Sequence, residues 1–412
     1  MSAAAEPVWP QYAGTKLLEE LKKNRRTSSR GARSFTEKAL RGGSRVVMIN
    51  LNRRNVLVGM GAALLTGNPS HAEVSASDIA QRLAEAEQAG RVFGLHALLA
   101  SQGGRLVFEH YGKGEDWARG RPLGTVAFAP DVLHDLRSVS KSVVGLAYGI
   151  ALAEGRVPPP EASLYAQFPE YSDLAGQPGR DRLTIHNVLS MTLGLQWDES
   201  TVPYGNPANS EDAMDAAPDR FRFILDRPIV AEPGARWIYC GGATALLGQL
   251  IAKGTGDDLP TYCQRVLFGP LQFGGFEWHR DRRGDPIAAS GLRLLPPDLV
   301  KIGRLMQAGG RWDGRQIVPA EWVKRITTPV VTIDRERSYG YQWYMGDIAA
   351  GASSDHWFGG NGWGGQRLYV FPSHDLAVVI HCGNYGKPGR EQQRVVAAIM
   401  AEVVLPSFVS RT

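Results

Sequence analysis

Residues 135–145 read DLRSVSKSVVG and place a serine, Ser138, three positions before a lysine, Lys141. On an α-helix, residues three apart are neighbours, with Cβ atoms roughly 5–6 Å apart, so the lysine amine can reach the serine hydroxyl. Residues 143–152 are apolar almost all the way round, which is typical of a buried central helix. No other lysine of the chain has a serine three positions earlier. The stretch therefore predicts a buried helix that begins with a nucleophile and a base.

The start of such a helix would also favour attack of Ser138 on a carbonyl group. The first backbone N–H groups of a helix have no intrahelical partner and lie at the positive end of its dipole, so they would stabilise an oxyanion formed there. Apolar neighbours favour the neutral amine of Lys141, which can then accept a proton near pH 7. Because Ser-x-x-Lys often arises by chance, an ordinary solvated helix start is the alternative.

Residues 134–142, HDLRSVSKS, resemble the nucleophile segment of the serine β-lactamase and DD-peptidase superfamily, in its class C-like branch of esterases and amide hydrolases. Further segments resemble the same superfamily and follow in its order: 183–195 (LTIHNVLSMTLGL), 233–248 (PGARWIYCGGATALLG), 289–312 and 357–372 (WFGGNGWGGQRLYVFP). The matches extend from about residue 94 to about residue 385. The resemblance implies a β-lactamase/DD-peptidase-like fold of the α+β class, as a single domain over residues 73–412.

Local patterns in this domain predict strands near both of its ends and helices between them. Strands are expected at residues 95–100, 105–111, 367–371 and 377–382. Helices are expected at residues 78–88, with Ser77 as the N-cap, and at 392–404. This order predicts one antiparallel sheet built from both chain ends, with helices on its faces and a mostly helical insert at about residues 136–285.

The second motif, residues 233–248, carries the expected partner of the nucleophile. The resemblance places Tyr239 at the tyrosine of the family's Tyr-x-Asn element, which faces the nucleophile. A phenol near Lys141 can pass a proton between the nucleophile and the leaving group, and a cationic neighbour favours the phenolate. Packing of Tyr239 ahead of an apolar helix is the alternative.

The same motif departs from the family at its third position, where Gly241 replaces asparagine. The amide that would hold the substrate is therefore missing, and Cys240 or a backbone group is the expected replacement. Cys240 as a second nucleophile is a further alternative, although no histidine partner for it is evident in the sequence.

The third motif, residues 357–372, resembles the sheet-edge strand that closes the active site. Family members carry Lys or His, then Thr or Ser, then Gly, whereas this chain has Gly360, Asn361 and Gly362. By resemblance, the backbone N–H of Trp363 is the second oxyanion donor, beside the backbone N–H of Ser138. The glycines let the backbone approach a substrate closely. A bulge on an edge strand is the alternative.

The missing Lys or His bears on the substrate. In the family that residue helps to bind the carboxylate of penicillins and D-Ala-D-Ala peptides, and Gly360 cannot do so; His356 lies nearby, but no motif aligns it. We therefore expect a serine hydrolase that needs no metal or cofactor and acts through an acyl-enzyme on a small carboxylic ester or linear amide, similar to the family's esterases and 6-aminohexanoate-dimer hydrolases. Four aromatic residues would line an apolar acyl pocket, with core packing as a rival for each: Trp197, Tyr204, Trp237 and Trp363.

Other functions stay open on the sequence. A β-lactamase or D-Ala-D-Ala peptidase is the alternative within the family. A non-catalytic protein that binds cell-wall peptides is the alternative of another class; Gly241 and Gly360 support it, and the intact catalytic set opposes it. A metallohydrolase has no histidine-rich ligand spacing in its favour.

Composition limits the possible partners and cofactors. The chain has 412 residues, of which 43% are hydrophobic, enough for a large core. Residues 1–72 carry twelve Lys and Arg against four Asp and Glu, so residues 73–412 have a net charge of −3, which argues against nucleic-acid binding. The spacing of the three cysteines suits neither a zinc site nor a disulfide framework, and Cys263 and Cys382 are expected to be buried packing residues.

Residues 48–72 predict a twin-arginine export signal. Arg53 and Arg54 precede a short apolar segment at 56–65, and Ser-His-Ala at 70–72 fits a cleavage site. The apolar segment is too short to span a bilayer, so stable membrane insertion is not expected. Residues 1–47 would be a disordered upstream extension, and the protein would be periplasmic or secreted, or cytoplasmic if the signal does not function. An arginine-rich structural helix is the alternative.

Overall fold

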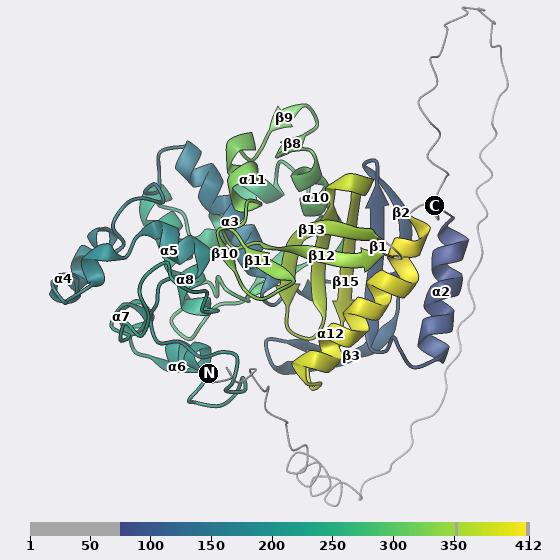
Figure 1. Cartoon of the computed structure of the whole chain (residues 1–412), viewed down its shortest axis with the longest axis horizontal. Helices are drawn as coiled ribbons and strands as arrows, with labels where there is room; N and C mark the ends of the chain where they lie inside the picture. Colours follow the sequence, from purple (N-terminus) through teal and green to yellow (C-terminus); the bar gives the residue numbers. More distant parts are fainter. Residues whose placement is uncertain (1–74, 351–352, 409–412) are drawn as a thin grey trace, which may run out of the picture. The chain divides into compact units, whose positions relative to one another are not determined.

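The computed structural model describes residues 75–350 and 353–408 (Figure 1). The predicted upstream extension at 1–47 and the predicted export signal at 48–72 lie outside the described residues. The described residues belong to one compact unit. Within these ranges, no helix combines the length and the apolar character needed to cross a bilayer.

One antiparallel sheet of eight strands forms the centre of the fold, in the order β10-β11-β12-β13-β14-β15-β1-β2. Its strands are β1 (Leu95–Gln102), β2 (Arg105–Tyr111), β10 (Val331–Thr332), β11 (Arg337–Tyr339), β12 (Tyr344–Ala350), β13 (Ser353–Gly362), β14 (Gln366–Phe371) and β15 (Leu376–Cys382). Because β1 pairs with β15, the sheet joins the two ends of the domain, and the predicted α+β fold is confirmed (Figure 1).

The hairpin at the start of the sheet is tighter than its sequence predicted. Strand β1 continues to Gln102, so a two-residue turn of Gly103 and Gly104 replaces the expected four-residue turn. Both glycines have positive φ angles, +56° and +73°, and two such residues in succession match the twist of an antiparallel hairpin.

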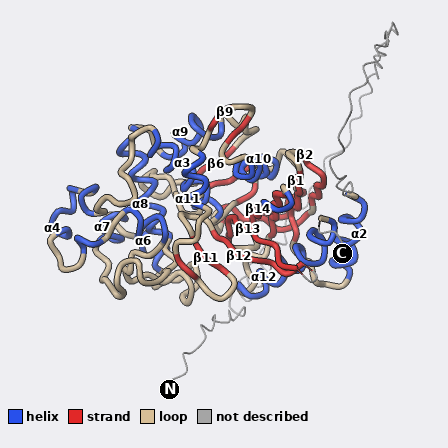
Figure 2. The backbone as a smooth tube through the Cα atoms, turned by 45° about the horizontal axis from the view of Figure 1, so that its top comes forward, coloured by secondary structure: helices blue, strands red, loops and turns tan. Residues whose placement is uncertain are grey.

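The helices are α2 (Ala76–Gln88), α3 (Val139–Ala153), α4 (Ser172–Ala175), α5 (Ile185–Ser190), α6 (Ser210–Ala216), α7 (Arg220–Leu225), α8 (Gly241–Thr255), α9 (Leu259–Cys263), α10 (Pro296–Gln307), α11 (Ala320–Ile326) and α12 (Gly389–Ala398). The insert between β5 (His134–Asp135) and β6 (Phe276–Trp278) is mostly helical, as predicted. Figure 2 shows α4, α6, α7 and α8 gathered to one side of the strands.

Three smaller sheets complete the strand inventory. They are β3 (Lys113–Ala118) with β4 (Arg121–Ala127), β5 with β7 (Leu292–Leu294) and β6, and β8 (Arg311–Trp312) with β9 (Arg315–Gln316). The sheet of β5, β7 and β6 matters most for function, because β5 ends three residues before Ser138.

Two helix boundaries differ from the prediction. Helix α2 begins at Ala76 with Ser75 as the residue before it, because the Ser75 carbonyl already accepts from the backbone N–H groups of Asp78 and Ile79. Ser77 therefore lies inside the first turn. The terminal helix begins at Gly389, and the π-helical segment Ile399–Val404 continues it to the predicted end.

The main sheet is covered on both faces. Along β1, Ala97 and Leu99 belong to the core that contains α3, α8 and α10, whereas Leu98 and Ala100 belong to the core under α2 and α12. Helix α3 is buried along thirteen of its fifteen residues, which confirms the predicted central helix. Its first turn thus lies inside the protein, between β13 and the helical insert.

Candidate active site

The start of α3 brings the predicted nucleophile and base together. The nitrogen Nζ of Lys141 donates hydrogen bonds to Ser138 Oγ at 3.1 Å and to the Ala289 carbonyl at 3.0 Å. Only 2% of Lys141 is exposed, whereas Ser138 is half-buried and reaches the surface. The residue before the nucleophile, Arg137, has a left-handed conformation with φ +50°, a strained state that non-glycine residues adopt where the surrounding structure requires it.

Tyr239 completes a three-residue cluster around Ser138 Oγ. Its hydroxyl donates to Ser138 Oγ at 2.5 Å, and Lys141 Nζ lies 4.8 Å from the centre of its ring. Burial, and next the negative charge of Glu199, raise the pKa of Tyr239 well above its ordinary value. The expectation that Lys141 would favour the phenolate is therefore wrong for the free enzyme, since these effects keep the phenol protonated.

The third motif lies on β13, which is an internal strand rather than the expected edge strand. Pairing with β12 ends at Gly359, however, whereas pairing with β14 continues through Gly360, Asn361 and Gly362 in regular register. The glycine segment therefore extends past β12 with one side unpaired within the sheet, and the alternative of a bulge is wrong.

This segment packs directly against the start of α3. A Cβ atom at Gly362 would lie 2.5 Å from the Leu136 carbonyl and 3.2 Å from Arg137 Cβ. Gly362 thus contacts Leu136 and Arg137, which lead into Ser138. Trp363, the predicted second oxyanion donor, is the next residue after Gly362. A Cβ atom at Gly360 would lie 2.9 Å from Val139 Cγ1 and 3.0 Å from Ser142 Oγ, so the Lys or His of the family would not fit there unless α3 moved.

The four aromatic residues proposed for an acyl pocket separate into two groups. Trp197 is only 7% exposed and belongs to the core, which favours the alternative of core packing. Trp237 is half-buried and contacts the Tyr239 ring at a centroid distance of 5.7 Å. Tyr204 packs edge-on against Trp363 at 5.9 Å. The last three therefore lie beside the predicted catalytic residues.

Two buried carboxylates near Lys141 were missed in the sequence. Glu199 lies in the loop after α5, and Glu211 lies in the first turn of α6. Glu211 Oε1 accepts from the Ser290 hydroxyl at 2.9 Å and pairs with Arg119 at 3.5 Å. Neither carboxylate has a regular spacing from Ser138 or Tyr239 in the sequence. The only sequence signal was Gly241, which replaces the family's asparagine and so indicates that another group is needed beside Tyr239.

The two carboxylates have opposite pKa shifts. Burial, and next the charge of Glu211, raise the pKa of Glu199 to about 7, although Lys141 acts in the opposite direction. Burial would also raise the pKa of Glu211, but the charges of Arg119 and Lys141 and the Ser290 hydrogen bond hold it below its ordinary value. Burial therefore favours the neutral form of Glu199, whereas the neighbouring positive charges favour the ionised form of Glu211.

The remaining candidates take no part in this cluster. Cys240 Sγ accepts from the Ala243 N–H at 3.3 Å, and burial together with the Glu199 charge raises the pKa of its thiol, so a nucleophilic role is disfavoured. Cys263 and Cys382 are buried and unbridged, as predicted. His356 is exposed and pairs with Asp347 at 3.2 Å.

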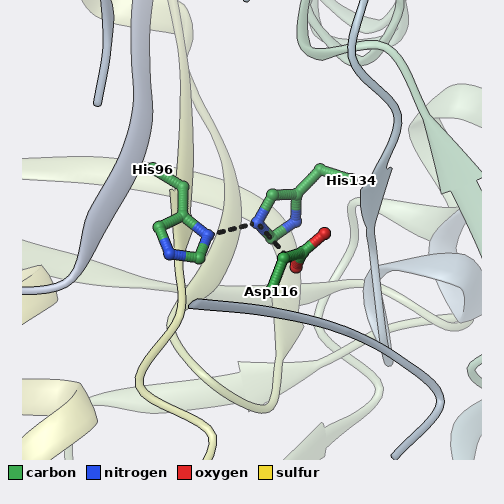
Figure 3. A group of neighbouring side chains, drawn as sticks. All are labelled: His96, Asp116 and His134. Carbon is green, nitrogen blue, oxygen red and sulfur yellow. Dashed lines mark hydrogen bonds and ion pairs between the residues drawn. The ribbon is translucent and has the colours of Figure 1, made fainter. Parts of the chain in front are cut away.

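One group among the described residues has the side-chain types and convergence of a metal site: His96, Asp116 and His134 (Figure 3). His96 Nδ1 and His134 Nε2 already share a hydrogen bond at 2.9 Å. Asp116 pairs with the guanidinium of Arg293 at 3.3 Å, and that positive charge opposes the binding of a cation. Burial lowers the pKa of both histidines. The group therefore fits a hydrogen-bonded structural cluster better than a metal centre.

Comparison with known proteins identifies the family. The beta-lactamase family matches residues 79–400. The 6-aminohexanoate-dimer hydrolase of Paenarthrobacter ureafaciens is 26% identical over 334 residues, which cover 76% of this chain and 78% of that protein. A putative 6-aminohexanoate-dimer hydrolase from Bacillus anthracis has a similar structure, with a TM-score of 0.61, 19% identity and coverage of 74% of this chain and 78% of that chain. A class C beta-lactamase superimposes with a TM-score of 0.58, 15% identity and coverage of 82% and 97%.

The fold and the cluster around Ser138 define a serine hydrolase of the β-lactamase/DD-peptidase type. The chain belongs to the beta-lactamase family.

Proposed function

We propose that this enzyme hydrolyses a carboxylic ester or a linear amide through an acyl-enzyme on Ser138. The observation that carries the proposal is the pair of hydrogen bonds to Ser138 Oγ, from Lys141 Nζ at 3.1 Å and from Tyr239 Oη at 2.5 Å. Serine nucleophiles require a base within this range, and a second proton carrier can serve the leaving group.

In the acylation step, Ser138 Oγ bonds to the substrate carbonyl carbon while its proton passes to the neutral amine of Lys141, in the pair that Lys141 forms with the protonated phenol of Tyr239. The bond from that carbon to the alcohol or amine then breaks, and the pair returns the proton to the leaving group. In the deacylation step, water attacks the ester carbon, its proton passes to the same pair, and Ser138 leaves with a proton as the acid is released. Backbone N–H groups of Ser138 and Trp363 would stabilise the oxyanion in both steps.

The preference for an ester or linear amide over a β-lactam rests on Gly360. The structure leaves no room for a Lys or His side chain at this position beside α3, so a cation for a substrate carboxylate is missing there. The similarity to a 6-aminohexanoate-dimer hydrolase agrees with a linear amide. A β-lactamase or D-Ala-D-Ala peptidase activity is the second candidate, supported by the fold.

Two experiments test the proposal. A fluorophosphonate should add its mass to the Ser138 peptide of wild-type protein and leave Ser138→Ala unlabelled. Purified protein should then be assayed with p-nitrophenyl butyrate, the linear dimer of 6-aminohexanoate, and nitrocefin. Turnover of the ester or the dimer well above that of nitrocefin is expected. Faster hydrolysis of nitrocefin would favour the second candidate, and labelling of another residue would remove Ser138 from the mechanism.

We also propose, from the sequence of residues 48–72, export through a twin-arginine route to the periplasm or exterior. Mass spectrometry of the mature N-terminus checks this proposal. Cleavage just after Ala72 is expected, together with loss of export in an Arg53→Lys, Arg54→Lys variant. A mature chain that starts near Ser2 would contradict it.

A further inference from the structure

Glu199 occupies the space that the family's asparagine would need. A Cβ atom at Gly241 would lie 2.9 Å from Glu199 Oε1 and 3.5 Å from Ala289 Cβ. Ala289 also supplies the carbonyl that accepts from Lys141. A longer side chain at position 241 and the Glu199 carboxylate therefore compete for one place next to the residue that orients Lys141.

The Glu199 carboxylate links two segments of the candidate site. Its Oε1 accepts from the backbone N–H of Gly241 at 2.5 Å and from the indole N–H of Trp197. Its Oε2 accepts from the Tyr204 hydroxyl at 3.1 Å, and the Tyr204 ring packs against Trp363. Glu199 thus touches the segment of Tyr239 on one side and, through Tyr204, the segment of Trp363 on the other.

The negative charge of Glu199 interacts with Lys141 and Tyr239, the two residues proposed to transfer the proton. Only 6% of the residue is exposed, so water screens its interactions weakly. Its negative charge contributes to the raised pKa of Tyr239, and the Lys141 cation favours its ionised form. The other titratable or charged groups that act on it are Glu211, with Arg119 behind it, as well as Tyr204 and Cys240.

We propose that Glu199 is a positioning residue of this active site, which takes the place of the missing asparagine amide: it fixes the Tyr239 segment through the Gly241 N–H and sets the charge around Lys141 and Tyr239. This inference rests on the hydrolase mechanism proposed above. It also accounts for Gly241, because a side chain at that position would displace the carboxylate from where it now lies.

The first test removes the charge and keeps the shape. Glu199→Gln should lower kcat for p-nitrophenyl butyrate by about 10-fold to 100-fold, the cost of slight misplacement of reacting groups, with a smaller change in KM. It should also change the pH profile of kcat around neutrality, where an inflection is expected for wild type. Glu199→Asp, which keeps the charge, should recover part of the rate. The matched control is Glu85→Gln on the exposed face of α2, which should behave as wild type.

The second test exchanges the two side chains. Glu199→Ala should lose activity, and adding Gly241→Asn to it should restore part of that loss, because the amide can enter the vacated space. Gly241→Asn alone should be impaired, since Glu199 is still present. Thermal unfolding of each variant separates loss of folding from loss of rate. Wild-type kcat and pH profile in Glu199→Gln, or equal loss in the double variant and in Glu199→Ala, would overturn the proposal.

A measurement without substrate distinguishes failure of this inference from failure of the proposed function. Infrared difference spectra between pH 5.5 and pH 8.5 should show a carboxyl group that loses its proton near neutrality in wild type and in Glu85→Gln, and not in Glu199→Gln. If that signal is present but no ester, amide or fluorophosphonate reacts, the proposed hydrolysis is wrong while the placement of Glu199 holds. If wild type carries no such signal and turnover is unaffected by Glu199→Gln, the inference is wrong and hydrolysis stands.

Discussion

Two buried polar clusters differ in the charge that they hold: a histidine cluster of His96, His134 and His381, and a carboxylate cluster of Glu199 and Glu211 beside Lys141. In the histidine cluster, burial lowers the pKa of His96 to about 4 and of His381 to about 3, so the rings stay neutral. In the carboxylate cluster, Lys141 and Arg119 supply positive charges that keep Glu211 ionised. Burial disfavours the charged form in both clusters, and at Glu211 the neighbouring positive charges and hydrogen bonds outweigh that effect.

The difference bears on which cluster can influence the proposed proton transfer. Burial raises the pKa of Glu199 towards neutrality, so its charge can change in the pH range in which Lys141 and Tyr239 are proposed to work. The stacked rings of His134 and His381, 4.4 Å apart, would have to gain a proton far from water. We therefore expect the histidine cluster to contribute to the stability of the fold, and the carboxylate cluster to act on the proposed nucleophile Ser138 through Lys141 and Tyr239.

The largest effect is expected when Lys141 is replaced, because its neutral amine is the proposed base and its protonated form is a counter-charge for the two carboxylates. Lys141→Met should reduce kcat/KM for the best ester substrate by about 1,000-fold or more, because general base catalysis is worth about 10²- to 10⁴-fold and Glu199 and Glu211 lose their shared counter-charge. Steady-state kinetics checks this result. If the variant keeps more than a tenth of the wild-type kcat/KM, Lys141 is not the general base of the reaction.

The next effect concerns acid stability, which the histidine cluster should dominate. The folded state holds these histidines neutral, whereas the unfolded chain protonates them below a pKa of about 6.5. The unfolded state therefore binds more protons in this range, and stability should be complete above pH 6.5 and fall as the pH drops towards 4, by about 1.4 kcal/mol per pH unit for each histidine involved.

Urea unfolding at pH values from 7.5 to 4.5 measures that slope. His96→Phe keeps a ring stacked on Phe128. It should reduce the slope of unfolding free energy against pH by up to about 1.4 kcal/mol per pH unit, the contribution of one proton, while kcat at pH 7.5 changes little. Glu85→Gln, on the exposed face of α2, should leave the slope as in wild type. An unchanged slope in His96→Phe would show that the histidines are not buried in their neutral form.

A smaller effect is expected at the glycine that replaces the family's cation. Gly360→Lys places a side chain against Val139 and Ser142, and overpacking of this kind costs about 1–3 kcal/mol. Chemical unfolding should show that loss, and ester turnover should fall because the start of α3 shifts. A stable variant that gains nitrocefin hydrolysis would show that the space beside α3 is larger than the structure has it.

The smallest effect is expected at Cys240. Its thiol is buried and its pKa is raised, so a thiol reagent at pH 8 should not modify the folded protein, and Cys240→Ser should retain most of the activity. Mass spectrometry after brief exposure to iodoacetamide checks the first point. Rapid alkylation of Cys240 that abolishes turnover would support Cys240 as a nucleophile.

The sequence predicted those parts of the site that depend on local spacing or on a motif. Ser138 and Lys141 meet because three residues make nearly one helical turn, and Tyr239 was found through its motif. Glu199 was missed because its position depends on the path of a loop, for which no periodicity exists. The unpaired end of β13 was missed for a similar reason, since it follows from where β12 stops, and pairing between distant strands is not encoded in either strand alone.

The pairing of β1 with β15 has a consequence for the order of folding. Leu95 lies opposite Cys382, so the strand made first needs as its neighbour a strand made much later. Contacts between residues so far apart in the chain form late, because closing a long loop costs conformational entropy before any contact repays it. A nascent or truncated chain that lacks β15 would leave β1 with only β2 beside it, so the main sheet cannot be completed until β15 has emerged from the ribosome.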